Sequence, residues 1–145
     1  MFKRILIATD GSELAGKAVA TGLTLTKQLG AQTVAVTATE PWSAMSNGEG
    51  LAFSFPIEEY EQGSAEQAER ILAGVRKEAE QRGLACETVH VTDFPAEGIL
   101  ATAKAKGCDL IVMASHGRRG ISRLLLGSQA MRVVTQSTIP VLVCR

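Results

Sequence analysis

The chain has 145 residues, the length of one ordinary domain with a sizeable core, and we expect a single domain over residues 1–145. Its 15 Lys and Arg residues balance 15 Asp and Glu residues, so net charge gives no reason to expect nucleic acid or an anionic membrane surface as a partner. The first apolar run ends at Asp10, and no stretch approaches the length of a membrane span, which predicts a cytoplasmic protein without a targeting segment.

Hydrophobic periods divide the chain into alternating strands and helices. Runs rich in β-branched and aliphatic residues, bounded by turn residues, predict strands, and apolar residues at spacings of three and four predict helices. In chain order we expect a strand over 5–9, a helix over 13–29, a strand over 33–39, a long loop over 42–56, a helix that starts between 57 and 64 and ends at 82, a strand over 86–92, a helix from 95 to before 107, a strand over 110–114, a helix over 129–136 and a strand over 141–144.

This alternation predicts right-handed crossovers and a parallel sheet with helices on both faces. We therefore expect a doubly wound α/β fold of the Rossmann-like kind, with five parallel strands. Ligands bind such sheets beyond the carboxyl ends of the strands, where the strand order reverses. If the strands that end at Thr9 and Ala114 are neighbours there, Asp10 faces the loop that follows Ala114.

The last strand of the chain is short, apolar and terminal. An exposed edge of this kind invites pairing with a second copy of the chain, so we expect a homodimer. The residues expected at the dimer edge are Val141, Leu142 and Val143.

The stretch from Asp109 to Gln129 has the organisation of an anion-binding loop. A short apolar strand leads into the glycine-punctuated basic loop 115–120, and Gly127 and Ser128 come just before a helix. Glycines let the main chain approach a ligand closely, and the N–H groups and dipole of a first helical turn attract an anion. On this chemistry alone, a phosphate site and a plain strand-to-helix connection both stay open.

Several segments together carry a resemblance that covers the whole chain. They include ILIATDGSE at the start, TATEP after the second strand, DLIVMASHGRRGISRLLLGS and the closing IPVLVCR. The chain resembles the universal stress protein family, which implies an adenine nucleotide alpha hydrolase-like fold. ATP-binding members carry a glycine, two residues, a glycine, nine residues, and a glycine followed by serine or threonine. Here Gly117 and Gly127-Ser128 match, whereas Ala114 stands at the first glycine.

The resemblance implies a site for ATP or another adenine nucleotide, with magnesium near Asp10 held indirectly through water or phosphate. Ala8, Thr9 and Asp10 would line the ribose and phosphate side, and Ala38 and Met113 would border the adenine. The phosphates would be held largely by the main-chain N–H groups of Gly117, Gly127, Ser128 and Gln129. At Ala114 an ordinary backbone would weaken binding, and a positive φ would lower affinity by about tenfold. The implied nucleotide-binding residues are Ala8, Thr9, Asp10, Ala38, Met113, Ala114, Gly117, Arg118, Gly127, Ser128 and Gln129.

Three classes of function follow from these observations. The first is an ATP-binding regulatory module in the stress response, in which nucleotide occupancy orders the 42–56 loop. The second is a nucleotide-free universal stress protein that acts as a dimeric interaction module, with Ala114 as the clue. The third is an adenylating enzyme of the related α/β group, for which the segment from Ala8 to Ser12 is a poor match. Because the sequence has no GxxxxGK[ST] motif, we expect at most slow ATP hydrolysis.

Overall fold

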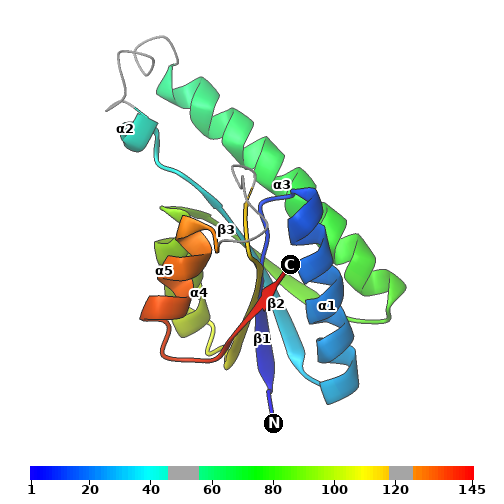
Figure 1. Cartoon of the computed structure of the whole chain (residues 1–145). Coiled ribbons are helices and arrows are strands. Elements are labelled where there is room, and N and C mark those ends of the chain that lie inside the picture. Colours follow the sequence, from blue (N-terminus) through cyan, green and yellow to red (C-terminus); the bar gives the residue numbers. More distant parts are fainter. Residues whose placement is uncertain (46–55, 118–125) are drawn as a thin grey trace.

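The computed structural model describes residues 1–45, 56–117 and 126–145. Within these ranges, five strands form one parallel sheet in the order β3-β2-β1-β4-β5 (Figure 1). The strands are β1 (Arg4–Ala8), β2 (Gln32–Thr39), β3 (Cys86–Thr92), β4 (Leu110–Ala114) and β5 (Val141–Cys144). The helices are α1 (Glu13–Leu29), α2 (Trp42–Met45), α3 (Ile57–Gln81), α4 (Pro95–Ala105) and α5 (Ser128–Gln136).

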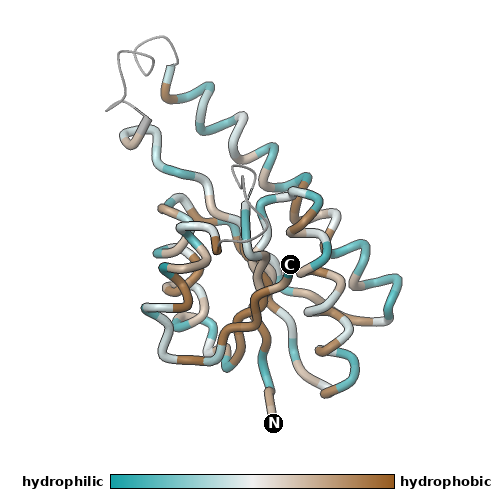
Figure 2. The backbone as a smooth tube through the Cα atoms, viewed as in Figure 1, coloured by the Kyte–Doolittle hydropathy of each residue, from teal (hydrophilic) through white to brown (hydrophobic). Residues whose placement is uncertain are grey.

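The long helices form one layer on each face of the sheet. Figure 1 shows α1 and α3 on one face and α4 and α5 on the other. Ile7 and Val112 belong to the core cluster under α1 and α3, while Leu6 and Ile111 belong to the cluster under α4 and α5, as expected for side chains that alternate along a strand. In Figure 2 the strands are largely hydrophobic, whereas much of α3 is hydrophilic. The expected doubly wound α/β fold is confirmed.

Except in the segment after β2, the bounds of the elements agree with the sequence prediction to within one residue. The loop predicted over 42–56 is wrong in its first part, because Trp42–Met45 form the short helix α2, in which the Pro41 carbonyl accepts the N–H of Ala44 at 2.9 Å. Residues 46–55 of that prediction lie outside the described residues. In the described ranges, no helix has the length and apolar character needed to cross a membrane.

Strand order reverses between β1 and β4, which are direct neighbours. Ile5 pairs with Leu110 and Ile7 with Val112, while β2 lies on the other side of β1. The carboxyl ends of β1 and β4 therefore meet at the edge of the sheet where ligands bind in this class of fold. The two strands are therefore neighbours where the strand order reverses, which is the arrangement under which Asp10 was expected to face the loop that follows Ala114.

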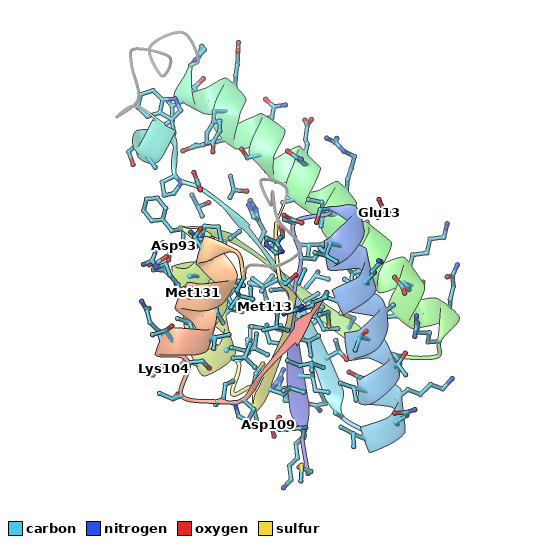
Figure 3. All side chains as sticks on the ribbon, in the orientation of Figure 1. Glu13, Asp93, Lys104, Asp109, Met113 and Met131 are labelled. Carbon is cyan, nitrogen blue, oxygen red and sulfur yellow. The ribbon has the colours of Figure 1, made fainter. Side chains whose placement is uncertain are left out.

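The amino-terminal end of β4 is fixed by Asp109, at the opposite end of the strand from Met113 (Figure 3). The Asp109 carboxylate accepts the N–H of Lys3 at 2.8 Å and that of Arg4 at 3.0 Å, which ties the start of β1 to the start of β4. Desolvation raises the pKa of this carboxyl, but hydrogen bonds from backbone N–H groups outweigh it and hold the pKa below its ordinary value. Because this anchor lies at the amino-terminal ends of β1 and β4, it does not occupy the opposite edge of the sheet, where their carboxyl ends lie.

Candidate functional site

A crevice of about 600 Å³ lies beyond the carboxyl ends of β1, β2 and β4. Its volume is within the range of small-molecule sites, and it lies where the strand order reverses. Arg118 falls outside the described residues. The other residues predicted for the nucleotide site all line this crevice: Ala8, Thr9, Asp10, Ala38, Met113, Ala114, Gly117, Gly127, Ser128 and Gln129.

The turn between β1 and α1 places Asp10 at the rim of the crevice. The N–H of Gly11 donates to Thr9 Oγ1 at 3.1 Å, and the N–H of Ser12 donates to Asp10 Oδ1 at 2.9 Å. Gly11 has a φ of 78°, a conformation that other residues rarely adopt. A Cβ added at Gly117 would lie 2.9 Å from Asp10 Oδ2. The bare backbone at Gly117 therefore allows the loop after β4 to approach the carboxylate.

Helix α5 begins at the opposite side of the crevice with an open first turn. The N–H of Gly127 donates to the carbonyl of Ser115 at 2.8 Å, so this predicted phosphate donor is engaged within the protein. The first N–H of α5 with an intrahelical acceptor is that of Met131, which donates to Gly127 at 2.9 Å. The N–H groups of residues 128–130 have no acceptor in the part of the chain that the structure describes. These groups remain available to an anion.

The other end of the crevice is apolar. Ala38 lies near the carboxyl end of β2, Met113 belongs to β4, and Ile99 belongs to α4. Met113 and Ile99 are each 6% exposed and belong to the core cluster under α4 and α5. The crevice thus has a polar end between Asp10 and α5 and an apolar end beside α4.

Ala114 is an ordinary strand residue. It pairs with Cys144 of β5, so its backbone is extended and the alternative of a positive φ does not apply. Its side chain is 8% exposed and belongs to the core cluster under α1 and α3. The methyl group is therefore accommodated without strain of the main chain.

One wall of the crevice was not predicted from the sequence. Tyr60, Ser64, Gln67 and Ile71 of α3 line it, and their spacings of four, three and four place them on one stripe of the helix. Tyr60 Oη donates to the carbonyl of Glu40 at 2.6 Å, which ties the start of α3 to the segment after β2. The signal in the sequence was this polar stripe beside the apolar stripe that packs on the sheet.

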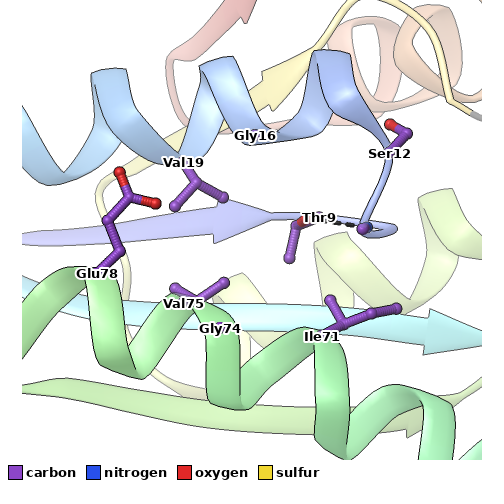
Figure 4. Close-up of a pocket in the computed structure, with 9 residues that line it drawn as sticks. Thr9, Ser12, Gly16, Val19, Ile71, Gly74, Val75 and Glu78 are labelled. Carbon is purple, nitrogen blue, oxygen red and sulfur yellow. Dashed lines mark hydrogen bonds between the residues drawn. The ribbon is translucent and has the colours of Figure 1, made fainter.

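A smaller pocket of about 250 Å³ lies between α1 and α3 (Figure 4). It shares Thr9 with the larger crevice. Gly16 and Gly74 leave it open, since a Cβ added at either position would meet nothing within 4 Å. The carboxylate of its acidic residue, Glu78, pairs with Arg82 at 2.9 Å. The carboxylate of this pocket is therefore already paired, whereas the residues predicted for the nucleotide site line the larger crevice.

The C-terminal strand β5 lies at one edge of the sheet, as expected. The N–H of Ile111 donates to the carbonyl of Pro140, and that of Ser115 donates to the carbonyl of Cys144. Alternate residues of a strand point their backbone groups to the same side. The N–H and C=O groups of Val141 and Val143 therefore point away from β4, toward the free edge.

Comparison with known proteins identifies the family. The model of the universal stress protein family matches residues 1–145. Universal stress protein YxiE from Bacillus subtilis is 32% identical, and the alignment covers 100% of both chains. The solved structure of MJ0577 from Methanocaldococcus jannaschii is 29% identical with a TM-score of 0.84, covering 99% of this chain and 96% of that chain. A universal stress protein solved in complex with cAMP is 22% identical with a TM-score of 0.72, covering 98% of this chain and 95% of that chain. The chain belongs to the universal stress protein family.

Proposed function

We propose that the chain binds ATP, or another adenine nucleotide, in the crevice and acts as a nucleotide-dependent regulatory module in the stress response. The observation that carries the proposal is the open first turn of α5, which faces the crevice beside the contact between Asp10 and Gly117. Unpaired N–H groups and the positive end of a helix dipole attract phosphate. A universal stress protein of the same fold was solved in complex with cAMP.

The two ends of the crevice match the two halves of a nucleotide. The N–H groups of residues 128–130 would donate hydrogen bonds to the phosphates at the polar end. Ala38, Met113 and Ile99 would enclose the base at the apolar end. Burial of the base supplies hydrophobic stabilisation, and the fixed N–H groups supply orientation. We propose binding without rapid turnover, because the sequence lacks the lysine-bearing phosphate loop of nucleotide hydrolases.

Magnesium fits this crevice as a partner of the phosphates. In the described ranges, no three His, Cys, Asp or Glu side chains group closely enough to hold a metal ion. Magnesium commonly keeps several waters and binds through one or two carboxylates together with substrate phosphates. Asp10 would supply the carboxylate through water, with its Oδ1 oriented by the N–H of Ser12. The bound ion would reduce the repulsion between the phosphates and this carboxylate.

The structure of β4 favours nucleotide binding over the nucleotide-free alternative. That alternative depended on Ala114, whose strand conformation and packing under α1 leave the main chain unstrained. The tie between Tyr60 and Glu40 places the start of α3 at the same crevice. Occupancy of the crevice would thus be transmitted to α3 and the segment after β2, which we propose as the regulated surface.

Asp10→Asn is expected to remove most of the magnesium dependence of ATP binding. Asparagine keeps an oxygen that accepts the N–H of Ser12, so the turn is preserved while the charge is lost. Without magnesium the variant should bind ATP at least as well as the original chain, because the repulsion between carboxylate and phosphate is gone. Calorimetric titration with ATP, with and without magnesium, measures this.

The matched control for that experiment is Asp93→Asn. Asp93 follows β3, another strand of the same sheet, and its Oδ1 accepts the N–H of Phe94 at 2.8 Å, but it does not line the crevice. This control should keep the full magnesium dependence. The same magnesium dependence in the Asp10 variant and the control would remove Asp10 from the metal site.

We also propose that the chain forms a homodimer through its β5 edges. Val143→Pro is expected to raise the dimer dissociation constant by about tenfold or more, because proline removes an N–H that points toward the free edge. The ladder to β4 should stay intact, and Val143→Thr, which keeps the N–H, should dimerise normally. Sedimentation equilibrium measures both. A monomeric original chain, or a proline variant that dimerises unchanged, would contradict this interface.

A further inference from the structure

The side chain of Gln129 links the first turns of α4 and α5 at the crevice. Its Oε1 accepts the N–H of Ala96 at 3.1 Å, and the residue lines the crevice together with Pro95 and Ile99. Phe94, at the N-cap position of α4, supplies no side-chain cap, so Gln129 satisfies a donor that the helix itself leaves unpaired. One end of the Gln129 amide is therefore committed to the fold.

This hydrogen bond fixes which end of the amide remains for a ligand. Because Ala96 contributes an N–H, the atom that it contacts must be the amide oxygen, and the amide nitrogen must be at the other end. No acceptor among the described residues contacts Gln129 Nε2, and this nitrogen is not sealed from solvent. The side chain is half-buried. Gln129 therefore offers an oriented N–H donor that has no acceptor within residues 1–45, 56–117 and 126–145.

The partner of Gln129 lies in the turn of α4 that borders the apolar end of the crevice. Ala96 belongs to the first turn of α4, and a Cβ added at Gly98 in the same turn would lie 3.5 Å from the Cβ of Ala38. Ala38 and Met113 line that end. In such surroundings a polar donor discriminates strongly between ligands, because a ligand that lacks a matching acceptor leaves the donor without a hydrogen bond.

We propose that Gln129 Nε2 donates to a ring nitrogen of the bound purine and so contributes to base selection. The inference rests on the proposed nucleotide function and adds a residue that reads the base to the main-chain groups that hold phosphate. Removal of the ring acceptor from the ligand should weaken binding about three- to tenfold, the effect of one lost hydrogen bond. The main-chain N–H of Gln129 can still serve the phosphate end.

Two variants separate the donor from the cap. Gln129→Glu keeps an oxygen for the N–H of Ala96 but has no N–H to donate, and Gln129→Leu loses both groups. Gln136→Leu makes the same change on the exposed last turn of α5, away from the crevice, and is the control. Thermal unfolding establishes that each variant folds, and the Glu variant should do so even if the Leu variant does not.

The experiment compares ATP with 1-deaza-, 3-deaza- and 7-deaza-ATP by calorimetry for each protein. All four ligands carry the same phosphates, so the charge that Glu introduces cancels in the ratio of affinities. In the original chain and the Gln136→Leu control, one analogue should bind about three- to tenfold more weakly than ATP. In the Gln129 variants that analogue should bind as well as ATP, which is the coupling expected of a direct contact.

Two results overturn the inference and one overturns its basis. If the ratio of the affinities for ATP and the weaker analogue is the same in the original chain and in the Gln129→Glu variant, Nε2 does not contact the ring acceptor. An original chain that binds all four ligands equally shows that no ring nitrogen is read. A chain that binds none of them contradicts the proposed nucleotide function itself, which distinguishes that failure from the first two.

Discussion

Gly127→Ala is expected to lower the affinity for ATP by at least about tenfold and to destabilise the fold by about 1–3 kcal/mol. The new Cβ would lie 2.9 Å from the carbonyl oxygen of Ser115 and 3.4 Å from the Cα of His116. Both are main-chain atoms, so neither can rotate away. The turn must shift, and the 2.8 Å bond from the Gly127 N–H to Ser115 lengthens. The first turn of α5 would then move out of position for phosphate.

Gly63→Ala is the control for this prediction. A Cβ added at Gly63, within α3, would meet nothing within 4 Å. The substitution should leave ATP affinity unchanged and stabilise the protein by up to about 1 kcal/mol, because alanine favours a helix over glycine. Calorimetric titration and chemical denaturation of both variants give the comparison. Tight ATP binding by the Gly127 variant would show that the start of α5 does not hold the phosphates.

Ile7→Ala is expected to destabilise the protein by about 2–5 kcal/mol, since Ile7 lies fully buried in the central strand β1. Gly22→Ala, on the facing side of α1, is expected to cost about 1–3 kcal/mol. A Cβ there would lie 2.6 Å from Ile7 Cδ1 and 2.7 Å from Cγ1. The two residues therefore fit one another, and this contact sets the distance between α1 and β1.

The double variant should lose less stability than the sum of the single variants, by about 1 kcal/mol or more. The methyl group added at position 22 would occupy part of the volume vacated at position 7, so each substitution reduces the cost of the other. Denaturation in urea, with the free energy of unfolding extrapolated to water, measures all four proteins. Strictly additive losses would mean that α1 does not pack on β1 in this way.

Elements with strong local signals could be predicted from the sequence. Helix α1 runs over the predicted residues 13–29, because Ser12 caps its start, with Oγ accepting the N–H of Ala15 at 3.2 Å, and Gly30 follows its end at a φ of 63°. Strand β4 is a continuous buried run, as expected for a central parallel strand. These signals depend on neighbours in the chain alone.

Features that depend on distant contacts could not be predicted in this way. The short helix α2 has a weak local pattern. The hydrogen bond from the Gly127 N–H to the carbonyl of Ser115 joins two residues that are not neighbours in the chain. The link from Gln129 to Ala96 joins residues 33 positions apart in the chain. The family motif predicted residues that line one crevice, the proposed site, and tertiary contacts decide which of its groups are engaged within the protein.

Calorimetric titration of the purified protein with ATP and magnesium tests the proposed function most directly. We expect saturable binding at a single site per chain, with affinity that falls in the Gly127→Ala variant and persists in Gly63→Ala. Protein that already carries nucleotide should release it on denaturation, where mass spectrometry identifies it. Absence of heat at millimolar ATP, in protein shown to release no nucleotide, would contradict the assignment of the crevice as a nucleotide site.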